Sequence, residues 1–194
     1  MEIRCQIIHS LSLALSPDTA PYLLEQVVDD PDPRILSLNA DLVSYDEIVT
    51  RFLRGQEIAF MRAGLGLLID SLLVSKAGAL GAMNGNGYGR MQLNILVIQQ
   101  NLKNIEQDVS LQRAARYYDL FTEGPEAVVK KAKESKEGAE AKGSKDTFSY
   151  DELKTMVELC FSEQLANPER GVSSVAKRSM GEYLLQLSEH MWQS

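Results

Sequence analysis

The sequence is poor in the residues that build disulfide frameworks and metal sites. Its 194 residues include two cysteines, two histidines and one tryptophan. Cys5 and Cys160 lie on apolar helical faces without a CxxC spacing, so we expect two reduced, buried thiols in a cytosolic protein. No Asn-x-Ser/Thr sequon occurs, and Glu2 and Arg4 stand where the apolar core of a signal peptide would begin. These absences argue against a secreted protein.

Catalytic and cofactor-binding motifs are also missing. His9 and His190 stand at opposite ends of the chain, and neither belongs to an HExxH or Cys/His zinc pattern. The glycine-rich stretch 85–89 follows an expected helix and lacks the Lys-Ser/Thr ending of a phosphate loop. The acidic stretch 29–33 lacks EF-hand spacing and contains two prolines, which favours an exposed linker over a metal site. The sequence therefore predicts no enzyme, no metal site and no cofactor.

Charge and hydropathy argue against two further classes of function. The formal net charge is −7, and no expected helix carries the basic stripe that nucleic-acid binding requires. The apolar stretch 65–74 is too short to span a membrane and contains Asp70, which indicates a core helix. We therefore expect neither a nucleic-acid partner nor a membrane span.

What the sequence does contain is a strong helical pattern over residues 56–107. Apolar residues recur at three- and four-residue intervals in two arms, which places each set on one helix face. The sets are Ile58, Met61, Leu65, Leu68 and Leu72, and then Met91, Ile95, Ile98, Leu102 and Ile105. The connecting stretch 83–89 holds three glycines and two asparagines, which favour a turn. We predict an antiparallel helical hairpin.

The opposite side of this hairpin is apolar as well. At about 100° per residue, a second set lies opposite the first. Its members are Phe60, Leu67, Val74, Leu93, Leu96 and Val97. A helix that is apolar on two sides has to be covered on two sides. We therefore predict that the hairpin is the middle layer of a bundle and that Leu67 and Leu96 are buried.

Beyond Ile98 the outer side of the second arm becomes polar, with Gln100, Lys103, Asn104 and Gln107. Gln100, Asn104 and Gln107 carry amides, which lose less on burial than charged side chains do. A solvated face and an interface with a partner helix both fit this pattern. These residues, together with the terminal Trp192, are the candidate interaction surface.

Further helices are predicted on both sides of the hairpin. Residues 2–15, 111–122 and 170–191 show helical spacing, and capping boxes at Ser44 and Ser149 predict helix starts at 45 and 150. The first helix has no N-cap residue, which suggests that the natural chain continues upstream. No run of alternating apolar and polar residues occurs, so the expected fold class is all-α, built as antiparallel helical bundles.

The domain organisation follows from a change in composition. Residues 130–146 consist of small and charged residues, which cannot bury enough apolar area to order a chain segment. We predict a bundle over 1–129 centred on the hairpin, a flexible low-complexity loop over 130–146, and a helical pair over 147–194.

Several stretches resemble one known family in their order and spacing. They include Glu2-Ile3-Arg4-Cys5-Gln6, Asp30-Pro31-Asp32-Pro33, Leu38-Asn39-Ala40-Asp41-Leu42, Gly64-Leu65-Gly66, Gln99-Gln100-Asn101-Leu102 and Ala115-Arg116-Tyr117-Tyr118. Together they resemble the C-terminal part of exocyst complex component four, the subunit Sec-eight, and the later stretches look like its fungal form. The resemblance covers nearly the whole chain except the 130–146 loop.

This resemblance implies a fold and a role. The implied fold is a rod of stacked helical bundles, as in multisubunit tethering complexes. The implied role is to hold secretory vesicles at the plasma membrane before fusion, together with other exocyst subunits and without an enzyme activity or cofactor. Two alternatives stay open: a peripheral membrane module that binds anionic lipid through the Lys-rich loop 130–146, and a generic helical adaptor.

Overall fold

The computed structural model describes residues 3–19, 21–137 and 147–192, without the side chains of 135–137 and 191–192. Its helices are α1 (Ile3–Ala14), α2 (Pro33–Phe52), α3 (Gln56–Arg62), α4 (Leu65–Ser75), the 3-10 helix η1 (Ala77–Leu80), α5 (Gly85–Leu102), α6 (Gln112–Glu123), α7 (Pro125–Glu137), α8 (Tyr150–Ala166) and α9 (Arg170–Trp192). These described residues form no strand, and one isolated bridge pairs Tyr22 with Met83. The predicted all-α fold class is confirmed.

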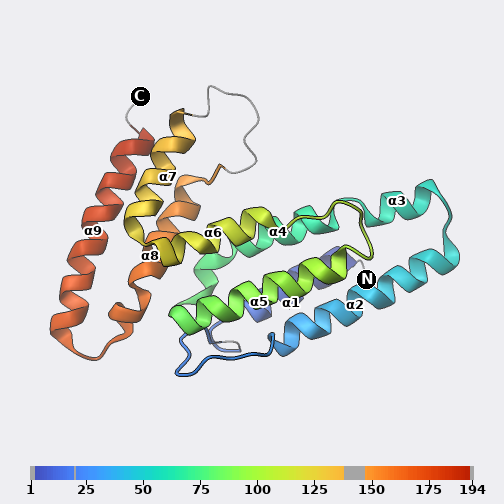
Figure 1. Cartoon of the computed structure of the whole chain (residues 1–194), viewed down its shortest axis with the longest axis horizontal. Helices are drawn as coiled ribbons and strands as arrows, with labels where there is room; N and C mark the ends of the chain where they lie inside the picture. The colour runs from blue at the N-terminus through green and yellow to red at the C-terminus, as the bar shows by residue number, and fades with distance from the viewer. Residues whose placement is uncertain (1–2, 20, 138–146, 193–194) are drawn as a thin grey trace.

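The helices form two groups that cross each other (Figure 1). In the first group α1, α2, α4 and α5 lie alongside one another, and in the second group α7, α8 and α9 pack together. Helix α6 joins the groups, because it packs on α4 and α5 as well as on α7 and α8. Helix α3 extends the first group, packs on α2 and buries none of its residues.

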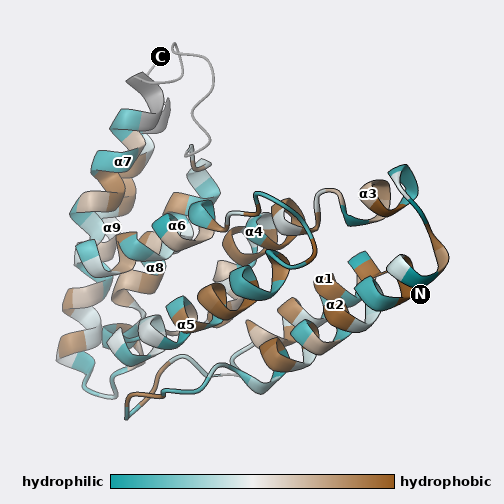
Figure 2. Ribbon diagram, turned by 45° about the vertical axis from the view of Figure 1, so that its right-hand side comes forward, coloured by the Kyte–Doolittle hydropathy of each residue, from teal (hydrophilic) through white to brown (hydrophobic). Residues whose placement is uncertain are grey.

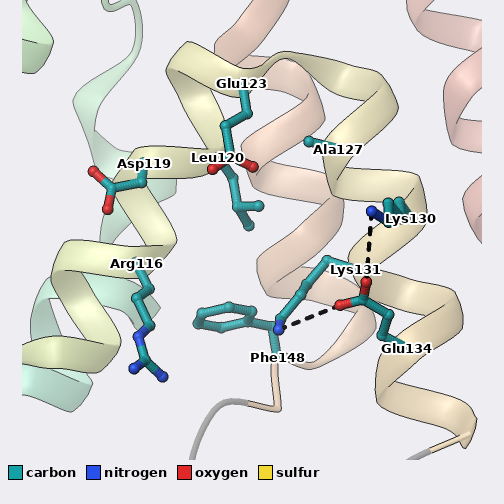
Figure 3. A pocket seen from close by; sticks show the side chains of 9 residues that line it. All are labelled: Arg116, Asp119, Leu120, Glu123, Ala127, Lys130, Lys131, Glu134 and Phe148. Atoms are coloured by element: carbon teal, nitrogen blue, oxygen red, sulfur yellow. Dashed lines mark ion pairs between the residues drawn. The ribbon is translucent and has the colours of Figure 1, made fainter.

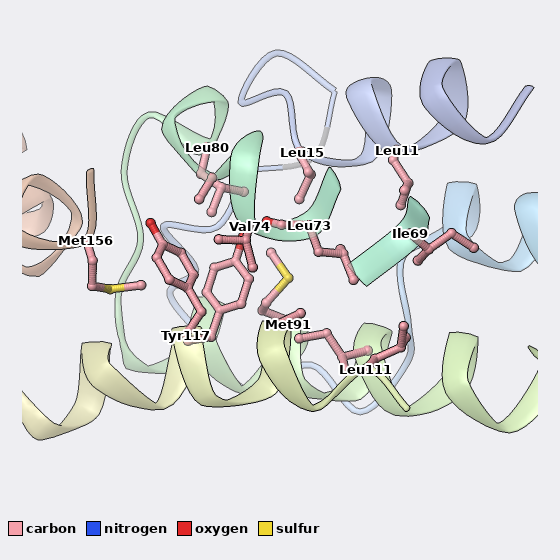
Figure 4. Close-up of a cluster of buried hydrophobic side chains, with 14 of the residues drawn as sticks. Leu11, Leu15, Ile69, Leu73, Val74, Leu80, Met91, Leu111, Tyr117 and Met156 are labelled. Atoms are coloured by element: carbon pink, nitrogen blue, oxygen red, sulfur yellow. Dashed lines mark hydrogen bonds between the residues drawn. The ribbon is translucent and has the colours of Figure 1, made fainter. Parts of the chain in front are cut away.

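One hydrophobic core runs through both groups. Figure 4 shows Leu11, Ile69 and Leu73 meeting in the first group, while Tyr117 of α6 reaches toward Met156 of α8. All five side chains are almost fully buried. Burial of a side chain of this size contributes about 1.5–3 kcal/mol, so a core shared by both groups ties them together.

The second predicted arm is confirmed, but the first arm is two helices. Met91, Ile95, Ile98 and Leu102 of α5 are buried as the spacing predicts. In the first arm, Gly64 has a φ of 78°, which ends α3 and sets the start of α4. Residues 56–75 match a membrane-spanning helix in length, and an 18-residue window within them has a mean hydropathy of 1.7, but this break divides them.

The predicted burial of Leu67 and Leu96 is wrong, although Val74 of the same predicted set is buried. Leu67 is 72% exposed, Leu96 is 49% exposed and Phe60 is 75% exposed. Helix α4 instead turns Leu65, Ile69 and Leu73 inward. Truncating Leu67 or Leu96 is therefore not expected to open a cavity in this chain.

Two helices begin at other residues than the sequence predicts. In one case tertiary contacts override the local pattern, and in the other a stronger start signal lies further upstream. The predicted turn 83–89 is wrong from Gly85 onward, where α5 begins after its N-cap Asn84. The predicted helix start at 45 is also wrong, since α2 runs unbroken from Pro33 and Ser44 lies inside it. Asp32 caps α2 with Pro33 as the first helical residue, which is the favoured place for proline. By contrast, the capping box at Ser149 and Glu152 is confirmed.

Two further predictions need correction. Residues 130–137 are not a loop, because α7 continues to Glu137 and buries its own Val128, Val129 and Ala132. The remaining part of the predicted loop, 138–146, lies outside the described residues. Cys160 is partly buried, and its pKa is raised to about 12 by burial, but Cys5 is exposed on α1.

Candidate interaction surface

The structure exposes the predicted interaction residues but does not place them on one helix. Gln100 lies on the last turn of α5, which ends at Leu102. Asn104 and Gln107 follow in the turns after the helix, and both are exposed. Gln107 lines a surface hollow together with Leu67. Trp192 ends α9, and its side chain lies outside the described residues.

The N-terminus of α5 is held by the extended segment around Tyr22 and Leu24. The Asn84 side chain accepts a hydrogen bond from the Gly87 amide at 3.0 Å and also bonds both the amide and the carbonyl of Leu24. A Cβ atom at Gly87 would lie 1.7 Å from the Tyr22 carbonyl oxygen. Gly87 is therefore needed for the close approach of two backbones.

A buried polar cluster links α2, α5 and the same segment. The Asp32 carboxylate, which is almost fully buried, pairs with the Arg90 guanidinium at 3.1 Å. The Asp32 amide donates to the Asn94 side-chain oxygen at 2.8 Å, and the Asn94 amide donates to the Tyr22 hydroxyl at 3.1 Å. Burial, followed by the charge of Asp32, raises the pKa of Tyr22 to about 12. The acidic stretch predicted as an exposed linker thus ends in a buried, paired carboxylate.

Two acidic side chains cap helices that are distant in sequence. Asp70 on α4 accepts the Ala114 amide at the start of α6 at 2.8 Å. Glu106 accepts the amides of Gly64 and Gly66 at the start of α4, at 2.8 and 3.0 Å. Neither α4 nor α6 has a side-chain cap of its own. The unpaired amides of both helix starts are thus satisfied by tertiary contacts.

Replacing Asp70 by alanine should lower the free energy of unfolding by about 1–3 kcal/mol, because the Ala114 amide would lose its buried acceptor. Asp70→Asn keeps an acceptor and should lose less. Urea denaturation at neutral pH measures both variants. Equal losses for the two substitutions would contradict this role.

The charge of Asp70 also makes stability depend on pH. Burial raises the pKa of Asp70 above its ordinary 3.8, although the Ala114 amide and the Arg113 charge lower it. The folded state therefore binds this proton more tightly than the unfolded state does, and the Asp70 contribution to stability falls as pH rises above 3.8. As the pH rises above 3.8, the free energy of unfolding of the wild-type chain should fall relative to that of Asp70→Asn. The difference between the two should become constant once the pH exceeds the pKa of Asp70 in the folded state. A constant difference across the titration would contradict this sign.

The two helix groups are joined by an ion pair beside an aromatic cluster. Arg113 of α6 contacts both carboxylate oxygens of Glu152, at 2.8 and 2.7 Å, and lies over the Phe148 ring. The Tyr117 hydroxyl donates to the Glu152 carbonyl at 2.7 Å, and burial raises the pKa of Tyr117. These contacts hold α8 against α6.

A hollow of about 240 Å³ lies between α6 and α7 (Figure 3). Its lining residues carry both charges and are Arg116, Asp119, Leu120, Glu123, Ala127, Lys130, Lys131, Glu134 and Phe148. Glu134 pairs with Lys130 and Lys131 at 4.0 and 3.6 Å. Because the lining contains as many acidic as basic side chains, its charge favours neither an anion nor a cation. Among the described residues, no group of three or more His, Cys, Asp or Glu side chains could hold a metal ion.

These observations define a class of protein: a helical module whose buried polar groups fix helix packing and whose exposed helix faces are available to partners. No family model matches the sequence. Over its whole length, however, the chain is 52% identical to the probable exocyst complex component sec8 of Neurospora crassa, of which it covers 20%. It is 31% identical to exocyst complex component 4 of Dictyostelium discoideum over 53% of the chain and 9% of that protein. It is 29% identical to the human protein of that name over 62% of the chain and 13% of that protein.

The chain belongs to the family of exocyst complex component 4, whose fungal relatives are named sec8. It spans about a fifth of the length of the Neurospora crassa relative. The resemblance found in the sequence is therefore confirmed. The tertiary caps Asp70 and Glu106 and the buried pair Asp32–Arg90 were missed, although Asp32-Pro33 carries an N-cap signal that the sequence could have revealed.

Proposed function

We propose that this chain is a scaffold segment of an exocyst complex, which tethers secretory vesicles to the plasma membrane before fusion. The observation that supports the proposal best is the 52% identity, over the whole chain, to a protein named as an exocyst component. A packed helical module with exposed helix faces is the kind of structure expected of a segment that positions other subunits. Because the chain spans a fifth of that relative, the proposal assigns it a share of the scaffold and not the whole activity.

In this role the partners are other exocyst subunits in a hetero-oligomeric complex. The segment acts in the cytoplasm, at sites of secretion on the plasma membrane, and reaches the vesicle and plasma membranes through its partners. It catalyses no reaction and uses no metal or cofactor. The exposed amides of Gln100, Asn104 and Gln107, and Trp192 at the end of α9, are proposed contact residues.

The lipid-binding alternative receives less support. Its Lys-rich stretch begins inside α7, where Lys130 and Lys131 are paired with Glu134. Paired cations contribute little attraction to an anionic membrane. A scaffold role does not depend on this stretch.

Affinity purification of the full-length protein from its own cells tests the proposal. With a tag placed at the natural gene, the other exocyst subunits should be recovered in near-equal amounts by quantitative mass spectrometry. A cell line that expresses the tag alone is the control. Recovery of the protein without any exocyst subunit would refute the proposal.

A further inference from the structure

Two serines in the chain stand in the sequence pattern that arginine-directed protein kinases select. Such kinases bind an arginine three residues before the serine or threonine that they phosphorylate. In this sequence an arginine stands at that distance only before Ser37, where it is Arg34, and before Ser173, where it is Arg170. The pattern does not distinguish the two serines, but the structure places them in very different surroundings.

Ser37 is exposed, but the helix around it is fixed to the core. A protein kinase binds its substrate segment in an extended form, so a serine in a helix is accessible only where the helix opens locally. Ser37 lies inside α2 between Ile35 and Leu38, which are 2% and 0% exposed. The Arg34 guanidinium donates to the Thr19 carbonyl at 2.7 Å. Opening α2 here would expose core side chains, so the folded chain should protect Ser37.

Ser173 lies near the start of α9, in a segment that can open without disturbing the core. Figures 1 and 2 show the turn between α8 and α9 at the outer end of the second helix group, and Figure 2 colours this turn mainly as hydrophilic. From 163 to 175, a stretch that the structure describes throughout, no residue is buried. Gly171 weakens the first turn of α9, because glycine has a low helix propensity. Local opening around Ser173 therefore costs little.

The side chains around Ser173 are also arranged to bind a phosphate on it. A hollow of about 360 Å³ at this position is lined by Ser173, Ser174 and two cations, Arg170 and Lys177, and no acidic residue lines it. Neither cation forms an ion pair with another described residue. They stand three residues before and four residues after Ser173, which places both on its side of α9. A phosphoserine would bring about −1.5 to −2 charges and three acceptor oxygens between them.

We propose that Ser173 is a phosphorylation site for an arginine-directed protein kinase, and that Arg170 and Lys177 bind the phosphate after the start of α9 has re-formed. In the reaction the Ser173 hydroxyl oxygen attacks the γ-phosphorus of ATP and forms a new O–P bond, while the bond from that phosphorus to the ADP oxygen breaks. The hydroxyl proton passes to a carboxylate of the kinase. Arg170 serves both recognition by the kinase and binding of the phosphate, whereas Lys177 serves only the second. The inference does not depend on the proposed function.

The first test uses the full-length protein, treated with phosphatase and then incubated with ATP and the catalytic subunit of cAMP-dependent protein kinase. Quantitative mass spectrometry measures the rate of phosphate incorporation at Ser37 and Ser173, in the protein and in synthetic peptides 31–41 and 167–177. The ratio of the protein rate to the peptide rate should be at least about tenfold higher for Ser173, because only its segment opens easily. Arg170→Gln should lower the rate at Ser173 at least about tenfold, and Lys177→Gln should leave it unchanged.

The second test measures whether the phosphate is bound. In the full-length protein, amide hydrogen exchange over 170–177 should slow at least about threefold on phosphorylation, because the new contacts oppose opening of the helix start. Lys177→Gln should reduce this slowing while phosphate incorporation stays the same. Ser188→Ala is the matched control, since Ser188 lies on the same helix with Leu185 in the place of the arginine, and it should change neither measurement.

The modification should also occur in the cell. The full-length protein purified from its own cells with phosphatase inhibitors should contain phosphoserine at 173, and Ser173→Ala should remove that phosphopeptide. Absence of this phosphoserine would overturn the inference. Equal rate ratios for Ser37 and Ser173 would also overturn it, as would hydrogen exchange over 170–177 that phosphorylation does not change.

Discussion

Replacing Gly87 by alanine should lower the free energy of unfolding by about 3 kcal/mol or more, which is large for the addition of one methyl group. The new Cβ atom would lie 1.7 Å from the Tyr22 carbonyl oxygen, a backbone atom that cannot rotate away. Relief requires the segment around Tyr22 to move, which breaks the bond from the Asn84 amide to that carbonyl and the contacts of Asn84 with Leu24. Urea denaturation followed by circular dichroism measures the loss.

Gly89→Ala is the matched control, because it lies two residues away on the same helix. Its Cβ atom has no neighbour within 4 Å, so the variant should gain up to about 1 kcal/mol from helix propensity alone. The two substitutions are therefore expected to differ in sign. Similar effects from both would mean that the crossing of Tyr22 over α5 is not rigid.

The two glycines illustrate what the sequence can and cannot predict about the fold. The buried stripe of α5 follows from helical spacing alone, because one face of that helix meets the core along its whole length. The start of α5 does not follow from local pattern, because Gly87, one of the glycines that suggest a turn, allows the backbone of the distant Tyr22 to cross the helix. Likewise, the break at Gly64 is stabilised by Glu106, which is distant in sequence.

The candidate surface was predicted only in part for a related reason. An apolar residue opposite a buried stripe predicts that another element packs against it. The pattern does not say whether that element belongs to the same chain. Leu67 and Leu96 were assigned to the core on this basis and are exposed. Gln100 is exposed, as expected for the polar outer side, and Lys103 on that side is exposed as well.

Asp32→Asn should destabilise the chain by about 3–5 kcal/mol, although asparagine is as good an N-cap as aspartate. The substitution keeps an acceptor for the Arg34 amide, so the start of α2 retains its local cap. What it removes is the countercharge of Arg90, whose guanidinium is mostly buried and whose Nε already has no hydrogen-bond partner among the described residues. A buried cation without its carboxylate bears the full cost of desolvation.

A double-mutant cycle separates the pair from the cap. Arg90→Met combined with Asp32→Asn removes both charges and should recover about 1–3 kcal/mol relative to the sum of the single losses. The exposed pair Arg178–Glu182 provides the comparison, because Glu182→Gln should change stability by less than about 1 kcal/mol. If the cycle shows no coupling, the loss at Asp32 belongs to its contacts with Asn94 and the start of α2.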